Sequence, residues 1–350
     1  MKPVKFIFAT LFSNKNVINE SKNQPWWLAI VLMLLSCIIS VIPAFTGAMS
    51  TNGSDALTAT QNFGIDLSLK QFSLDYLRDD NDEYKFVIKD GKLEVENFTN
   101  AEVKINDKTA LLVYYVDYTE EDKALYETFD DKMSVELSKV RVSFPVEGKE
   151  NTSRLYSTLM LGKEKVYLSL YGANAMCTYS PNANADGSYT INSYENVENN
   201  YIQLEGTYEL IDGDLANLSG YAYGSSEGEM AKNAFENWKQ FFDKAYITPR
   251  NTAAFITNGA MIGVSILIVL SSTLMIFLLS KSKSSVRKYK FGESLKMVSF
   301  ASFSPALISL LIGWLIPSFQ SMAFVMCLVL RATWLGMKAT GPQDTDTVRK

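Results

Sequence analysis

The stretch MVSFASFSPALISLLIGWLIPSFQSMAFVMCLVL, residues 297–330, contains no charged residue. Its 34 positions exceed the roughly 20 residues that one crossing of a bilayer needs. Pro317 and Ser318 lie at its middle, where a tight turn would fall. Because a chain in lipid must pair its backbone N–H and C=O groups internally, both halves are predicted to be helical. The stretch therefore predicts two transmembrane helices, over residues 297–316 and 317–338, in a multi-pass α-helical membrane protein.

An earlier apolar segment, residues 25–49, predicts a first span. It opens with Pro25, Trp26 and Trp27, and tryptophan is enriched at the level of the lipid headgroups. A cleaved signal peptide is the alternative, but its apolar core has only about 7–15 residues. The uncharged run here extends over residues 23–54, which favours an uncleaved anchor.

Residues 251–280 predict another span, so that the chain has four. Gly259 and Gly263 form a GxxxG pattern in it, which lets another helix approach closely. Glycine is common in membrane helices, so the pattern is a weak sign of a packing face.

Charge is divided unevenly along the chain. Residues 51–250 hold 19 Lys and Arg against 34 Asp and Glu, whereas the remaining segments hold 14 against 4. The sequence thus predicts an acidic soluble domain, residues 50–250, inserted into a basic and apolar membrane unit. The net charge of −5 argues against a nucleic-acid partner.

Basic residues in two segments predict the orientation. Residues 1–24 carry four lysines with apolar side chains between them. This pattern is typical of a helix that lies on the inner membrane surface and contacts lipid, and a frayed tail is the alternative. Residues 281–296 form a basic loop. By the positive-inside rule both segments are cytoplasmic, together with the tail 339–350. The acidic domain is then extracytoplasmic.

Alternating residues and turn signals predict an α+β fold rich in antiparallel strands for the acidic domain. Asp90-Gly91 favours a type I′ turn between two strands over residues 84–96. A helix is expected after Thr119, and a long loop over residues 172–187. Further strands are expected at 102–105, 110–117, 140–146, 155–161, 165–171, 189–194 and 201–210, with a hairpin turn at Gly162-Lys163.

An apolar stripe predicts a helix over residues 227–246 that ends before Pro249. Phe235, Trp238 and Phe242 belong to this stripe. Because the helix leads into the second span, it is a candidate for passing a change in the domain to the membrane. The alternative is a helix that simply packs on the domain.

Apart from Lys338 at the very end of the last span, Arg331 is the single charge inside a predicted span, and no span offers an Asp or Glu to pair with it. Snorkelling toward the inner leaflet is one interpretation, with Glu293 as a candidate partner. A contact with an anionic lipid or a second membrane protein, shared with Trp334, is the other.

Pro305 is expected to kink the third span, with Ser302, Ser304 and Ser309 satisfying the freed carbonyl groups. A substrate path would show buried ionisable groups or paired broken helices. Neither is evident in the sequence, which disfavours a stand-alone transporter.

The composition excludes several catalytic centres. There is no histidine, and Cys177 is the one cysteine of the acidic domain, so zinc sites and Ser-His-Asp or Cys-His nucleophiles are excluded within this chain. The acidic run at 79–83 lacks the glycine and the distal glutamate of an EF-hand loop, which favours a solvated turn. We expect no enzyme, no metal and no cofactor.

Four sequence stretches stand out together with the three C-terminal spans. They are FIFATLFSNKNV (6–17), NQPWWLAIVLMLL (23–35), FVIKDGKLEVEN (86–97) and LMLGKEKVYL (159–168). This combination resembles a family of Gram-positive membrane proteins without an established function. Some members of that family are named maltodextrin-utilisation membrane proteins because they accompany sugar-uptake systems, and their membrane part is distantly Yip-like. The resemblance offers no catalytic residues.

These observations favour an accessory or regulatory membrane protein. Its outer domain is expected to bind a partner or ligand, in association with a sugar-uptake or other membrane complex. The alternatives are a transport subunit whose spans line a path and a non-catalytic membrane scaffold.

Overall fold

The computed structural model of the chain separates into two units, which are described one at a time. The helical unit is Met1–Ser50 with Thr252–Lys350, and the acidic domain is Thr51–Asn251. The expected limits of the inserted domain, 50 and 250, lie within a residue of these boundaries. The structure describes residues 3–58, 64–78, 83–106, 108–141, 147–171, 176–184, 189–195, 201–219, 227–282, 285 and 287–341.

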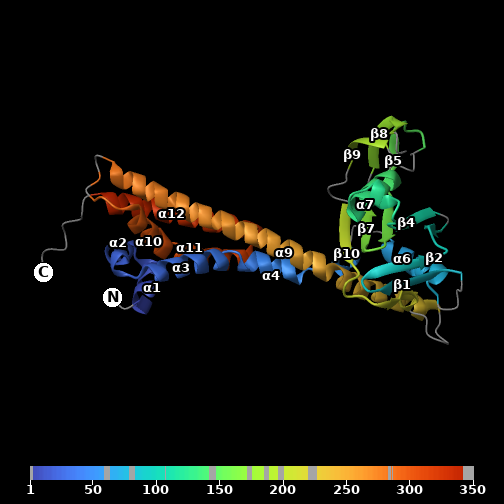
Figure 1. Cartoon of the computed structure of the whole chain (residues 1–350), viewed down its shortest axis with the longest axis horizontal. Helices are drawn as coiled ribbons and strands as arrows, with labels where there is room; N and C mark the ends of the chain where they lie inside the picture. The colour runs from blue at the N-terminus through green and yellow to red at the C-terminus, as the bar shows by residue number, and fades with distance from the viewer. Residues whose placement is uncertain are drawn as a thin grey trace. The chain divides into compact units, whose positions relative to one another are not determined.

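The helical unit confirms the prediction of long apolar helices (Figure 1). Four helices among the described residues are long and apolar enough to cross a membrane: Trp26–Ser50, Asn233–Lys281, Phe291–Leu315 and Gln320–Thr340. The helices are α1 (Pro3–Phe12), α2 (Asn14–Glu20), η1 (Ser21–Asn23), α3 (Trp26–Ile39), α4 (Ile42–Ser50), the C-terminal part of α9 (Glu227–Lys281), α10 (Phe291–Ala301), α11 (Phe303–Leu315), η4 (Pro317–Phe319) and α12 (Gln320–Thr340).

Two of these candidate spans are broken. The break in the third agrees with the kink expected at Pro305, whereas the break in the first was not predicted. The first is interrupted between α3 and α4, just before Pro43, and the third between α10 and α11, just before Pro305. Proline has no backbone N–H, so each break leaves helix groups that need other partners. The expectation that paired broken helices are missing is therefore wrong.

Helix α9 runs without interruption from Glu227 to Lys281, with Pro249 inside it. The prediction of a helix that ends before Pro249 is wrong. One proline costs a helix one hydrogen bond and some strain. Buried side chains on both sides of it, such as Ala245 and Ala254, offset that cost through packing.

The acidic domain is α+β, with three sheets in strand orders β11-β1-β2, β10-β7-β6-β4-β3 and β5-β8-β9. Its pairs are antiparallel except β4 with β6, which is parallel. The strands are β1 (Lys85–Lys89), β2 (Lys92–Glu96), β3 (Asn100–Ile105), β4 (Lys108–Val116), β5 (Thr152–Arg154), β6 (Ser157–Gly162), β7 (Lys165–Tyr171), β8 (Met176–Ala183), β9 (Tyr189–Glu195), β10 (Tyr201–Thr207) and β11 (Gly213–Asp214). The helices are α5 (Ser54–Thr58), α6 (Ile65–Tyr76), η2 (Asp122–Ala124), α7 (Phe129–Arg141), η3 (Leu215–Ser219) and the N-terminal part of α9.

The predicted hairpin at residues 84–96 is confirmed. Asp90 and Gly91 connect β1 to β2 with φ angles of 51° and 71°. Both values are positive, as a type I′ turn requires. The hairpin of β6 and β7 is also present, but its connection is Lys163-Glu164 and not Gly162-Lys163.

Other local predictions for this domain are wrong. The helix expected after Thr119 begins at Phe129, because Thr128 and Asp131 form its capping box, while Thr119 and Asp122 close only the turn η2. Helix α6 was not predicted, and strand β8 lies inside the predicted loop 172–187. Residues 140–141, where a strand was expected to start, are the end of α7.

Candidate functional site

Gln320 fills the break in the first candidate span. Its side-chain oxygen accepts a hydrogen bond from the backbone N–H of Ala44 at 2.8 Å, and its side-chain nitrogen donates to the carbonyl oxygen of Ser40. In an unbroken helix Ala44 and Ser40 would bond to each other, four residues apart. The amide of Gln320 is thus inserted into that bond. Its own carbonyl oxygen accepts from the Ser309 hydroxyl at 2.9 Å.

Arg331 fills the break in the third candidate span. Its Nη1 donates to the carbonyl oxygen of Ala301 at 2.9 Å, which is the oxygen that the missing N–H of Pro305 would have bonded. Its Nε donates to Oδ1 of Asn14 at 3.0 Å, and Nη2 donates to the carbonyl oxygen of Thr10. The guanidinium therefore joins α12 to α1, α2 and the α10–α11 break.

The expected serines take a smaller part at this break than predicted. Ser302 donates to the carbonyl oxygen of Ser299, and Ser309 bonds Gln320, so neither of them satisfies Ala301. Glu293, suggested as a partner of Arg331, instead forms an ion pair with Lys22 at 3.1 Å.

A groove of about 550 Å³ opens beside Arg331 within the helical unit. Residues 11–15 form one side, where α1 meets α2. Residues 304, 305 and 308 of α11 and residues 327, 330, 331, 334 and 338 of α12 form the rest. The groove brings together three predicted site residues, Pro305, Arg331 and Trp334. It adds Lys15 and Lys338, which were not predicted.

The lining of this groove combines positive charge with exposed apolar surface. Its charged residues are Lys15, Arg331 and Lys338, and no Asp or Glu lines it among the described residues. Nζ of Lys338 lies 5.2 Å from the centre of the Trp334 ring. Phe12 is 92% exposed and Trp334 is 54% exposed.

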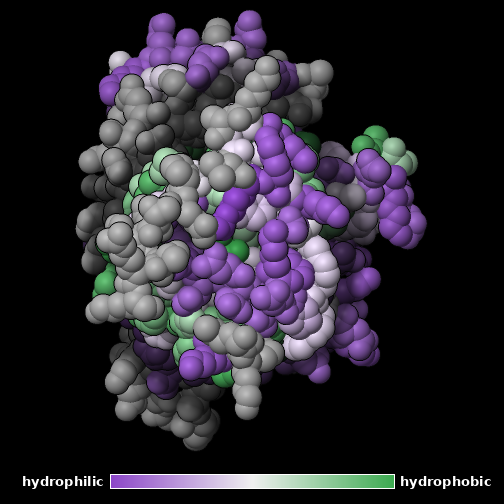
Figure 2. Space-filling view, turned by 90° about the vertical axis from the view of Figure 1, so that its left-hand side faces the viewer, coloured by the Kyte–Doolittle hydropathy of each residue, from purple (hydrophilic) through white to green (hydrophobic). Residues whose placement is uncertain are grey.

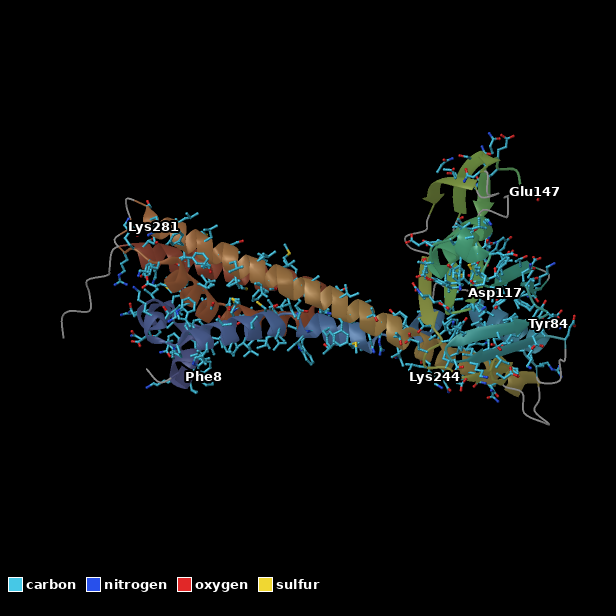
Figure 3. All side chains as sticks on the ribbon, in the orientation of Figure 1. Phe8, Tyr84, Asp117, Glu147, Lys244 and Lys281 are labelled. Atoms are coloured by element: carbon cyan, nitrogen blue, oxygen red, sulfur yellow. The ribbon has the colours of Figure 1, made fainter. Side chains whose placement is uncertain are left out.

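Further lysines gather at one end of the helical unit. Figure 2 looks onto that end, where hydrophilic residues predominate among the described surface near the viewer, and Figure 3 marks Lys281 there, at the end of α9. Lys22, Lys288 and Lys290 are exposed as well. Lys296 differs, because it is buried in α10, donates to the carbonyl oxygen of Gln24 at 2.6 Å and lies 5.0 Å from the ring centre of Trp26.

Gly259 and Gly263 face open space in α9. A Cβ atom added at either position would meet no heavy atom within 4 Å. The described part of this chain therefore packs no helix against the GxxxG pattern.

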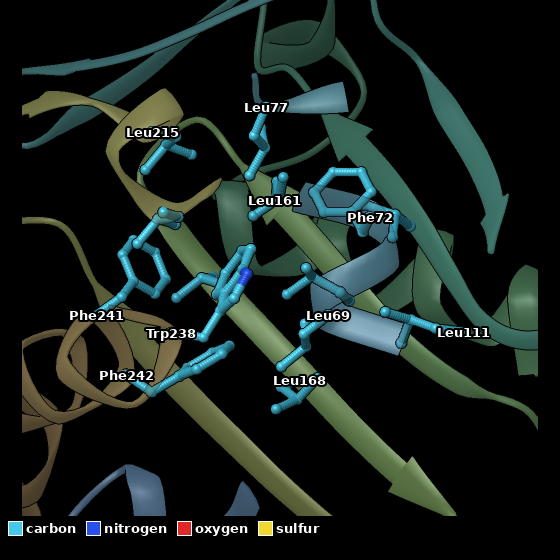
Figure 4. Packing of buried hydrophobic residues seen from close by; sticks show 14 of the residues in the cluster. Leu69, Phe72, Leu77, Leu111, Leu161, Leu168, Leu215, Trp238, Phe241 and Phe242 are labelled. Carbon is cyan, nitrogen blue, oxygen red and sulfur yellow. The ribbon is translucent and has the colours of Figure 1, made fainter. Parts of the chain in front are cut away.

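Trp238 lies at the centre of the acidic domain (Figure 4). It is 0% exposed, its Nε1–H donates to the Ser73 hydroxyl at 2.8 Å, and its ring stacks on Phe242 with centroids 5.6 Å apart. Phe72 and Leu69 of α6 complete this side of the core. The N-terminal part of α9 is thus a core element of the domain, which agrees with the expectation that this helix packs on it.

Phe235 lies at the edge of that core. It is partly buried, and the ammonium groups of Lys239 and Lys70 lie 4.8 and 5.6 Å from its ring centre. These contacts make it a boundary residue between the core and the surface.

Polar groups of the acidic domain form ion pairs. Lys165 bridges Asp130 and Glu205, with Nζ 2.7 and 2.9 Å from their carboxylate oxygens, and the hydroxyl of Tyr167 donates to Asp130 at 3.1 Å. Burial and these carboxylates raise the pKa of Tyr167. No group of three or more potential metal ligands occurs among the described residues, and residues 79–82 of the acidic run lie outside them.

Gln320 is the functional residue that sequence reasoning missed. An amide inside a charge-free run of 34 residues was a usable signal, since a buried polar side chain in an apolar helix needs a partner.

Comparison of the chain with protein-family models, curated proteins and solved structures finds no match.

Proposed function

We propose that this chain is a four-span membrane protein with a non-catalytic accessory or regulatory role. In this proposal both termini lie in the cytoplasm, and the acidic domain lies outside and binds a partner or ligand. The lysines at the end of the helical unit support the orientation, because basic segments remain on the cytoplasmic side.

The observation that carries this proposal is the double role of α9. Trp238 of α9 is a central residue of the acidic domain's core, and the same helix continues to Lys281 through the second candidate span. A ligand that repacks the core around Trp238 therefore acts on a helix that also belongs to the helical unit. A coupling of this kind needs two arrangements with different affinity for the ligand.

The exposed face of α9 supports a membrane-protein partner. Gly259 and Gly263 leave a surface on which a second helix could approach closely, and Phe255 and Leu267 beside them are 64% and 62% exposed. The resemblance to proteins that accompany sugar-uptake systems makes a transporter the first partner to examine.

The test is purification of the tagged full-length chain from its own membranes in a mild detergent. The proposal expects one membrane protein to co-purify in stoichiometric amount. A Gly259→Leu/Gly263→Leu variant should lose it, whereas the matched Val264→Leu variant, changed at an exposed neighbour, should retain it. A wild-type chain that runs alone in gentle detergent would contradict the proposal.

A second candidate function is a transport subunit, favoured by the two broken spans. Broken helices at corresponding positions line substrate sites in many transporters. In this chain, however, Gln320 and Arg331 occupy the freed groups. A Ser309→Cys variant, in a background without the native cysteines, separates the two functions. A path predicts that a water-soluble maleimide modifies it, and a dry four-helix packing predicts that it does not.

A further inference from the structure

We propose that the groove beside Arg331 binds the phosphate headgroup of an anionic phospholipid. This inference uses the membrane location and the orientation from the proposed function above. The accessory function proposed above does not require a ligand in this groove, and the inference assigns one to it.

The cation at the back of the groove is held in place before a ligand arrives. Three N–H groups of Arg331 are used by Thr10, Asn14 and Ala301. A guanidinium has five N–H donors, so two remain for a ligand. Its partners are two carbonyl oxygens and one side-chain amide oxygen, which orient the positive charge but do not neutralise it.

The charges around Arg331 are uncompensated. Lys15 and Lys338 are exposed at the groove, and among the described residues neither forms an ion pair. Three cations without an acid match a phosphate group. A planar guanidinium with flanking ammonium groups is well suited to its oxygens.

The apolar wall identifies the ligand as an amphiphile. Phe12, Ile308 and Leu330 are exposed beside the cations, and Trp334 presents its ring at the same place. A free phosphate ion would leave this apolar surface uncovered, whereas the acyl chains of a lipid would cover it. The volume of about 550 Å³ suits a headgroup with the first part of its chains.

The position of the groove in the helical unit also agrees with binding of a lipid headgroup. Basic pockets between membrane helices on the cytoplasmic side recognise anionic lipid headgroups. Lys338 lies in the last turn of α12, and Lys15 lies in the first turn of α2. Tryptophan and lysine near a helix end are the residues that anchor at this depth.

The experiment measures quenching of Trp334 by brominated lipid. The full-length chain is reconstituted in nanodiscs of phosphatidylcholine that contain increasing amounts of brominated phosphatidylglycerol, or of brominated phosphatidylcholine as the neutral arm. The signal of a Trp334→Phe variant is subtracted, because the chain has 5 tryptophans. The proposal expects a preference for phosphatidylglycerol.

Two charge variants separate a site from general attraction. Lys15→Gln/Lys338→Gln removes two lysines of the groove, and at about 1 kcal/mol for each lysine we expect it to lower the preference roughly 30-fold. Lys5→Gln/Lys281→Gln removes two exposed lysines elsewhere in the helical unit and should keep the preference. All four side chains are exposed, so folding is not at risk. Equal losses in the two variants, or no preference in the wild type, would overturn the proposal.

A competition arm separates lipid from free anion. Inorganic phosphate at millimolar concentration should leave the quenching unchanged, because it cannot cover the apolar wall. Displacement of the lipid by phosphate would overturn the assignment to a lipid. The measurement needs no partner protein, so its outcome is independent of whether the accessory function stands.

Discussion

Arg331 donates from Nη1 to the carbonyl oxygen of Ala301 at 2.9 Å and so replaces the N–H that Pro305 lacks. A charged residue inside an apolar helix thereby connects α12 to three other segments of the helical unit. The same side chain forms the back of a positively charged groove.

A double-mutant cycle tests this relationship. Arg331→Gln should lower the free energy of unfolding by about 1.5–3 kcal/mol, because hydrogen bonds from a charged donor are lost. Pro305→Ala returns an N–H to the helix, so Arg331→Gln should cost less in that background, with a coupling of roughly 0.5–3 kcal/mol. Unfolding in mixed micelles, followed by circular dichroism, measures both. Strictly additive effects would mean that the two residues do not share the Ala301 carbonyl group.

Gln320→Ala should also destabilise the helical unit. It removes the partner of the half-buried N–H of Ala44 and of the carbonyl oxygen of the buried Ser40, at about 1–3 kcal/mol for each group left unsatisfied. The neighbouring Ser321→Ala, at an exposed position, is the control and should change the midpoint of unfolding little. Equal midpoints for the two variants would show that the break does not need the amide.

Only contacts between residues close in sequence could be predicted. The β1–β2 hairpin follows from Asp90-Gly91, and the apolar runs give the four long helices. The stripe of α6, Ile65, Leu69 and Phe72, was visible in the sequence but was not read. Ser40, bonded by the Gln320 amide, and Thr10, bonded by Arg331, lie about 280 and 320 residues away along the chain, and no local pattern reports such contacts.

Trp238→Ala should unfold or strongly destabilise the acidic domain. Removing a fully buried tryptophan costs roughly 3–5 kcal/mol. Trp238→Phe should cost less, because Ser73 retains its own bond to the carbonyl oxygen of Leu69. Phe235→Ala, at the edge of the core, should cost less than Trp238→Ala. Near-UV circular dichroism of the full chain during denaturation ranks the three variants by their loss of stability. A larger loss for Phe235→Ala than for Trp238→Ala would contradict the placement of Trp238 at the centre of the core.

The pair of Asp122 and Lys132 should make the acidic domain sensitive to low pH. Their charged atoms lie 2.7 Å apart, and the hydrogen bond from Lys132, followed by that from Thr119, lowers the pKa of Asp122 from 3.8 to about 2. A carboxylate whose pKa is lower in the folded state stabilises the fold above its unfolded pKa. That stability is therefore present above pH 4 and is lost as the pH falls through 2.

The midpoint of unfolding measured between pH 5 and pH 2 checks this prediction. Asp122→Asn should be less stable than wild type at pH 5, and the difference should shrink toward pH 2. A difference that stays constant over this range would show that the charge of Asp122 contributes nothing.

The orientation of the acidic domain is the central claim, and labelling of single cysteines in intact cells tests it most directly. In a background without the 3 native cysteines, Glu120→Cys and Lys288→Cys place one thiol in each unit, at exposed positions. We predict that a membrane-impermeant maleimide labels the cysteine at position 120 in intact cells and the one at position 288 only after permeabilisation. Labelling at position 288 with protection at position 120 would contradict the account.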